Sequence, residues 1–124
     1  LAEMAQFNEL SWQLYQEALY SDYRDIQGGT TAEGIHTGVM AATIHVTLAT
    51  YAGVDTRQNE LSICPNLPEH WQALAFQFIH QGVTYQFSLT QTSVTITADK
   101  DTQLLVQGAL IPLTAERPKE VHYQ

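Results

Sequence analysis

The chain has 124 residues, 44% hydrophobic and 10% aromatic, which suits one ordinary domain or a piece of a larger protein. Thirteen acidic residues against five basic ones give a net charge of −8. Nucleic acid and anionic membrane surfaces are therefore excluded as expected partners, because no cluster of Lys or Arg offsets the repulsion. The charged fraction of 15% is below the roughly 25% typical of soluble domains, which indicates that some surface faces other protein.

The first 52 residues have a helical periodicity. Apolar side chains recur every three or four positions, in one stripe before the Gly28-Gly29 step and in a second stripe after it. The stripes consist of Phe7, Leu10, Leu14 and Ala18, and of Ile35, Val39, Ala42, Val46 and Ala49. The second segment is apolar around most of its circumference. We therefore expect a helix that is buried on most sides, which a single neighbouring helix cannot achieve.

Residues 60–113 change to a period of two. Leu74–Ile79 and Val83–Thr90 alternate apolar and polar side chains, and Val94 and Ile96 alternate with threonines. The Gln81-Gly82 and Gln91–Ser93 steps between these runs are typical of hairpin connections. The pattern predicts an antiparallel sheet with one buried face. From Arg117-Pro118 onward we expect a polar tail.

The segment from Gln27 to His36 is the densest functional signal. Two glycines allow a sharp turn, and we expect a helix to begin directly after them, with His36 in its second turn. Backbone amides at a helix N-terminus together with the hydroxyls of Thr30 and Thr31 would bind an anion. The alternative is a plain helix start, since Thr30 and Glu33 have the spacing of a capping box. In that alternative His36 is a hydrogen-bonded core residue.

Other polar residues give weaker signals. Asp22 and Asp25 flank Arg24 near an expected helix end, where solvated charges are the simpler interpretation. His36 and His45 lie on opposite faces of the second helix and cannot share a metal. Cys64 is the one cysteine, and we expect it to be buried. One cysteine cannot form a disulfide within the chain, so the sequence does not require an oxidising compartment.

The residues from Asp25 to Ala41, DIQGGTTAEGIHTGVMA, resemble the C-terminal signature of glycoside hydrolase family 65. This family includes maltose, trehalose, kojibiose and nigerose phosphorylases. The resemblance continues through Tyr51–Arg57 and Pro65–Pro68 to the Gly82 hairpin, so it extends over most of residues 4–98.

The resemblance implies an α+β chain with two parts. Residues 1–54 would be the last helical hairpin of an (α/α) barrel of six hairpins, and residues 55–124 an antiparallel β-sandwich. It also implies a site for inorganic phosphate, the co-substrate, formed by Gly28, Gly29, Thr30, Thr31 and His36. No cofactor or metal is implied. The general acid of the family, a glutamate, would lie upstream, so no catalytic residue is expected in these 124 residues.

The function that follows is an inverting α-glucoside phosphorylase, a glycosyltransferase-type enzyme, of which this chain would be an inactive C-terminal fragment. Its expected partners are the upstream barrel, a disaccharide and phosphate, and dimers are usual in the family. No signal peptide is visible, so we expect a cytoplasmic protein. One alternative is a related disaccharide hydrolase. Another is a non-catalytic carbohydrate-binding or interaction module, with Trp71, Tyr85 and Phe87 as a stacking platform.

Overall fold

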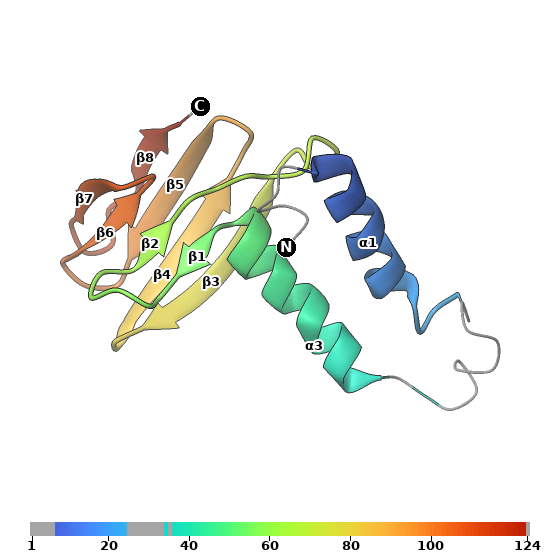
Figure 1. The fold of residues 1–124 in the computed structure, drawn as a ribbon. Coiled ribbons are helices and arrows are strands. Elements are labelled where there is room, and N and C mark those ends of the chain that lie inside the picture. The colour runs from blue at the N-terminus through green and yellow to red at the C-terminus, as the bar shows by residue number, and fades with distance from the viewer. Residues whose placement is uncertain (1–6, 25–33, 35, 124) are drawn as a thin grey trace. The chain divides into compact units, whose positions relative to one another are not determined.

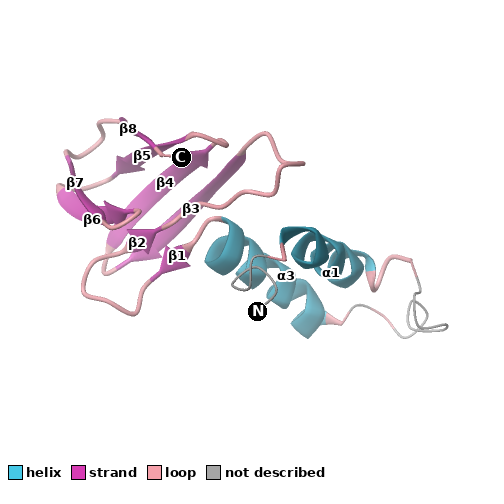
Figure 2. Cartoon of the chain, turned by 45° about the horizontal axis from the view of Figure 1, so that its top comes forward, coloured by secondary structure: helices cyan, strands magenta, loops and turns pink. Residues whose placement is uncertain are grey.

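The computed structural model describes residues 7–24, 34 and 36–123. The chain divides into two compact units, residues 1–50 and residues 51–124, which we call the helical unit and the strand unit. The described α-helices belong to the first unit and the described strands to the second (Figures 1 and 2). The α+β class predicted from the sequence is confirmed. The assignment of residues 1–54 to a barrel stays a prediction.

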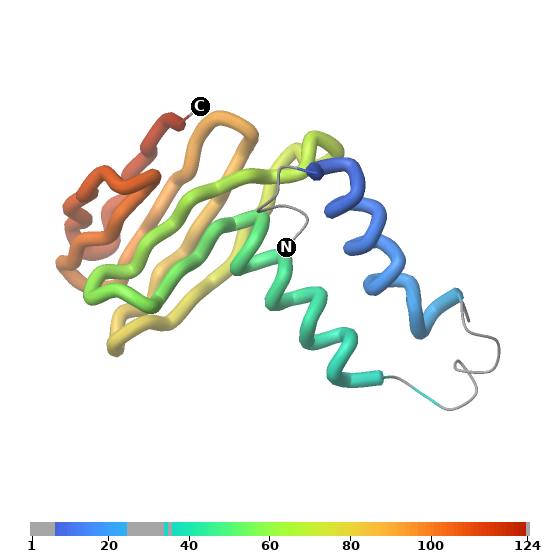
Figure 3. The backbone as a smooth tube through the Cα atoms, viewed as in Figure 1, coloured from blue at the N-terminus to red at the C-terminus, as the bar shows by residue number. Residues whose placement is uncertain are grey.

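The helical unit contains α1 (Asn8–Tyr20) and α3 (Thr37–Val46), and a π-helical turn η1 (Thr47–Tyr51) continues α3 (Figure 3). The Tyr15 hydroxyl lies 3.0 Å from Oγ1 of Thr47, which ties the two helical segments together. None of the described helices is long and apolar enough to cross a membrane.

The burial in these helices is the reverse of that in a normal helical core. The buried side chains of α1 and α3 are Ser11 and Thr43. Large apolar side chains are exposed instead, with Leu14 at 51% and Ile44 at 64%. The other exposed large apolar residues of these helices and of the residue before α1 are Phe7, Leu10, Leu19 and Val39. The apolar stripes predicted from the sequence are thus present but uncovered.

Among the described residues, the strands form two four-stranded sheets, which stack as a sandwich (Figure 2). The first has the order β1 (Val54–Asp55), β2 (Ser62–Ile63), β6 (Thr102–Val106), β7 (Ala109–Leu113). The second has the order β3 (Leu74–His80), β4 (Val83–Leu89), β5 (Ser93–Ala98), β8 (Lys119–His122). Hairpins join β3 to β4 and β4 to β5 at the two steps that the sequence predicts.

The core of the strand unit comes from the residues that the period of two assigns to one face. Phe87 of β4 lies opposite Phe76 of β3 and Ile96 of β5, and the rings of Phe76 and Phe87 stack at 5.0 Å. The Tyr85 hydroxyl reaches Oγ1 of Thr102 at 3.1 Å, so the second sheet is bonded to the first across this core. Burying side chains of this size contributes about 1.5–3 kcal/mol each.

Two parts of the sheet differ from the prediction. β2 and β6 pair in parallel, which is possible because the long connection through β3, β4 and β5 separates them along the chain. The expected polar tail is wrong, because Lys119–His122 form β8 and pair with β5. Within β8, Val121 lies opposite Val94. An edge strand needs few inward apolar residues, and charged edge residues prevent further pairing.

Cys64 is exposed, so its expected burial is wrong. Ile63 before it is fully buried, and alternation along an extended chain turns the next side chain outward. The Cys64 backbone is nevertheless closely packed, since its N–H donates to the Gly53 carbonyl at 3.0 Å. Gly53 itself has φ +67°, in the left-handed region that favours glycine.

An ion pair at the end of β1 makes the stability of the fold depend on pH in the acidic range. Asp55 accepts hydrogen bonds from Nε of Arg57 at 2.9 Å and from Nη2 at 2.7 Å, and these lower the pKa of Asp55 to about 2. The folded chain therefore holds the Asp55 proton less tightly than the unfolded chain. The pair contributes its full stability above the ordinary pKa of 3.8 and loses it as the pH falls towards 2.

We expect Asp55→Asn to lower the free energy of unfolding at pH 7 and to have a much smaller effect near pH 2, where about half of the Asp55 carboxyl groups are protonated. Urea denaturation at pH 7, 4 and 2 measures this difference. Arg57→Gln should show the same pH dependence, because it removes the other partner. A loss of stability that is equal at all three pH values would contradict this account.

Candidate functional site

Most residues of the predicted phosphate loop lie outside the described part of the chain. Gly28, Gly29, Thr30 and Thr31 lie outside the described residues, so their role stays a prediction. His36 is described, and its expected position in the second helical turn is wrong. α3 begins at Thr37, and His36 is the residue before it, with φ −80° and ψ 87°. Gly34 has φ +104°, which is incompatible with a right-handed helix at that point.

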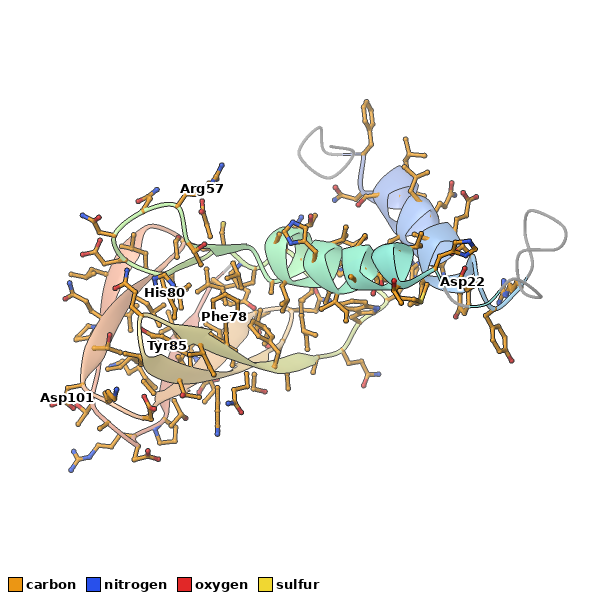
Figure 4. All side chains as sticks on the ribbon, turned by 90° about the horizontal axis from the view of Figure 1, so that it is seen from below. Asp22, Arg57, Phe78, His80, Tyr85 and Asp101 are labelled. Atoms are coloured by element: carbon orange, nitrogen blue, oxygen red, sulfur yellow. The ribbon has the colours of Figure 1, made fainter. Side chains whose placement is uncertain are left out.

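Asp22 holds His36 in this position. It lies just beyond the end of α1 (Figure 4), and its carboxylate accepts two hydrogen bonds from His36. The backbone N–H of His36 donates to Oδ2 at 2.6 Å, and ring Nδ1 lies 2.7 Å from Oδ1. The Asp22 side chain is only 11% exposed. The expectation that Asp22 is a solvated charge is therefore wrong.

Sequence reasoning missed this pair because 14 residues separate its members. Helical spacing and capping patterns relate residues three or four apart and are silent at this distance. The usable signal was the residue type, since Asp is among the best acceptors for backbone N–H groups at a helix start. The guanidinium group of Arg24 lies over the ring of Tyr20, 4.1 Å from its centroid.

The electrostatics of the pair follow from these bonds. The His36 side chain, and then its backbone N–H, lower the pKa of Asp22 against the opposing effect of burial, so Asp22 is a carboxylate at neutral pH. A carboxylate only accepts hydrogen bonds, so the proton of the ring sits on Nδ1. The His36 side chain is 45% exposed, and no hydrogen bond to its Nε2 exists among the described residues. Nε2 is thus the ring nitrogen that stays available to a ligand.

The arrangement suits the binding of an oxyanion. The N-terminus of α3 carries the positive end of the helix dipole, and His36 precedes its first turn. A protonated ring donates from Nε2 to an anion in a charge-assisted hydrogen bond. A neutral ring with its proton on Nδ1 accepts at Nε2 a hydrogen bond from an oxyanion that carries a proton.

The stacking platform of the carbohydrate-binding alternative is absent. Tyr85 and Phe87 are buried and stack on each other with ring centroids 5.9 Å apart. Trp71 is half-buried and packs edge-on against Tyr51 at 5.4 Å. Tyr85 and Phe87 therefore belong to the core of the strand unit, and the three rings do not form a common exposed platform for a sugar.

A shallow hollow of about 470 Å³ lies on the outer face of the second sheet. Its polar lining consists of Gln77, Gln86, Ser88, Thr95 and Thr97. None of the residues that line it titrates near neutral pH, so it supplies no acid or base for catalysis. The Asp22–His36 pair remains the candidate site.

The comparisons with known proteins agree with the sequence signature. Residues 54–112 match the C-terminal domain of glycosyl hydrolase family 65. The chain is 42% identical over 84 residues, 68% of its length, to trehalose 6-phosphate phosphorylase of Lactococcus lactis subsp. lactis strain IL1403, of which it covers 11%. It is 33% identical over 84 residues, again 68% of its length, to kojibiose phosphorylase of Escherichia coli strain K12, also covering 11%.

A solved structure, a putative kojibiose phosphorylase from the human microbiome, has the same fold. It superposes with a TM-score of 0.86 at 18% identity, over 99% of this chain and 18% of that chain. The chain therefore carries a family 65 C-terminal domain, and the resemblance stated from its sequence is confirmed. The chain spans 6–13% of the length of the curated relatives it matches.

Proposed function

We propose that the chain is the C-terminal part of an inverting α-glucoside phosphorylase and contributes its phosphate site. One observation carries the proposal: Asp22 fixes His36 at the start of α3 and leaves Nε2 for a ligand. His36 belongs to the signature segment from Asp25 to Ala41. The names of the similar proteins support the class, since trehalose 6-phosphate, kojibiose and 1,2-alpha-glucosylglycerol phosphorylases are among them.

In this proposal several groups around the turn each bind phosphate. The backbone amides of Gly28 and Gly29 and the hydroxyls of Thr30 and Thr31 bind its oxygens, and His36 adds a charge-assisted bond. Phosphate attacks the anomeric carbon on one face of the sugar, while an acid elsewhere in the complete protein protonates the leaving oxygen. The products are β-glucose 1-phosphate and the released acceptor. No metal or cofactor takes part.

The hydrolase alternative needs a carboxylate base to activate water. Among the described residues, Asp22 is the carboxylate beside His36, and both of its oxygens accept hydrogen bonds from that residue. It is therefore poorly placed to take a proton from water, which favours phosphate as the nucleophile.

A panel of α-linked glucose disaccharides, incubated with the complete protein with and without phosphate, tests the proposal. We expect glucose 1-phosphate to form in proportion to phosphate and little sugar release without it. Equal release of free glucose in both conditions would overturn the phosphorylase in favour of the hydrolase.

We further propose that other helices of the complete protein cover the exposed faces of α1 and α3. The exposed fractions of Leu14 and Ile44, 51% and 64%, support this, since uncovered apolar surface of this kind usually faces protein. A cytoplasmic location belongs to the same proposal, supported by the single free cysteine, Cys64.

We expect the 124-residue chain alone to self-associate through these faces. Leu14→Lys combined with Ile44→Lys should shift its sedimentation towards the monomer, because charge opposes apolar association. Gln13→Lys is the control, since it adds charge at an exposed polar position of α1, the helix that contains Leu14. A chain that is strictly monomeric at high concentration before any substitution would contradict the expectation.

A further inference from the structure

The contact between Asp22 and His36 has two points of attachment. One carboxylate oxygen binds the backbone N–H of His36 at 2.6 Å, and the other lies 2.7 Å from ring Nδ1. The first bond fixes the position of the residue, and the second fixes the rotation of the ring. A side chain held at both points has little freedom left to turn its Nε2 elsewhere.

Exposure shows that the two members have different surroundings. Asp22 is 11% exposed, whereas the His36 side chain is 45% exposed. The carboxylate is thus on the protein side of the pair and the ring on the open side. In many metal-ligating and catalytic histidines, a carboxylate or carbonyl behind the ring fixes its tautomer and orientation. Asp22 has the same position relative to the ring of His36.

We propose that Asp22 is the positioning residue of the phosphate site, which keeps the His36 proton on Nδ1 and directs Nε2 at the anion. This inference rests on the proposed function, because it needs His36 to bind phosphate. Asp22 itself does not touch the anion, since its negative charge would repel it. When Nε2 donates a proton to the anion, the Asp22 carboxylate offsets the resulting positive charge of the ring beside the positive end of the α3 dipole.

Asp22→Asn tests the inference in the complete protein. The carboxamide keeps the shape, and its oxygen can still accept the backbone N–H. It lacks the charge, and its amide nitrogen cannot accept a hydrogen bond from Nδ1–H. We expect the KM for inorganic phosphate to rise about tenfold, as when a histidine loses the carboxylate that orients it, while the KM for the disaccharide changes little.

A double-mutant cycle separates positioning from a structural role. In the His36→Asn background, Asp22→Asn should raise the phosphate KM no further, because the ring on which Asp22 acts is gone. Glu17→Gln is the matched control, since it removes the same charge from an exposed position on α1 and should leave the phosphate KM unchanged. If Asp22→Asn does not fold, Asp22→Ser replaces it, because a serine hydroxyl still accepts the backbone N–H.

The outcomes distinguish this inference from the proposed function. An unchanged phosphate KM in His36→Asn would overturn the placing of phosphate at His36. A raised KM in His36→Asn with a normal KM in Asp22→Asn would overturn only the role of Asp22. An equal effect of Asp22→Asn in both backgrounds, with a lower thermal midpoint, would assign Asp22 to stability and also overturn the inference.

Discussion

His36→Ala in the complete protein is expected to lower kcat/KM for phosphate by about 30- to 150-fold. This corresponds to the loss of about 2–3 kcal/mol, the magnitude of a hydrogen bond to a charged group in a site that excludes water. The disaccharide KM should change little. Stability should fall modestly, because alanine loses the bond between the His36 ring and Asp22 but keeps the backbone N–H that Asp22 binds.

His45→Ala is the matched control for this prediction. His45 is an exposed histidine near the end of the same helix and should tolerate alanine without a change in phosphate kinetics. If His36 were only a packed residue, its alanine variant would lose thermal stability and keep its phosphate KM. Measuring phosphate KM, kcat and thermal midpoint on one preparation separates these results.

Gly53→Ala is expected to destabilise the strand unit by about 3 kcal/mol or more. Its φ of +67° imposes a cost on any L side chain. A Cβ at this position would also collide with the carbonyl oxygen of Cys64 and lie 2.8 Å from its backbone nitrogen. Relieving the collision must move the two segments apart and weaken the bond between Cys64 N–H and the Gly53 carbonyl, itself about 1 kcal/mol.

Gly82→Ala separates the two contributions. Gly82 has φ +75°, but nothing lies within 4 Å of the position of an added Cβ. Its alanine variant should therefore lose only about 1 kcal/mol, from the backbone conformation alone. Urea denaturation of both variants measures the difference. Equal losses would mean that the contact between Gly53 and Cys64 does not restrict the position.

The sequence predicted the strand unit well where a local rule applied. Phe76, Phe87 and Ile96 alternate with polar residues and face the core together. The Gln81-Gly82 turn connects β3 to β4 with both residues at positive φ, as the type I′ hairpin requires. These features depend on residues that are close in sequence or related by a period of two.

The errors concern features that depend on distant contacts. β8 was missed because one inward residue, Val121, suffices for an edge strand whose other side chains are polar. The bond between Asp22 and His36 joins residues 14 apart, and no periodic pattern records it. The start of α3 was placed too early because glycines and a capping box indicate that a helix is near but not the residue at which it begins.

In the helical unit, the periodicity of apolar residues predicted the exposed faces but not the contacts between helices. The apolar stripes predicted surfaces that require cover, and Leu14 and Ile44 are indeed exposed. The contact between Tyr15 of α1 and Thr47 of η1 was not predictable, because side-chain periodicity identifies apolar faces and is silent about polar contacts between helices.

The position of phosphate in the complete protein tests the central claim most directly. A crystal soaked in arsenate, a phosphate analogue with a strong anomalous signal, locates the anion without reference to any model. We predict an arsenate oxygen about 2.7–2.9 Å from Nε2 of His36, with Nδ1 still bonded to Asp22. An arsenate in the active site that does not contact His36, or a ring turned so that Nδ1 faces the anion, would contradict the account.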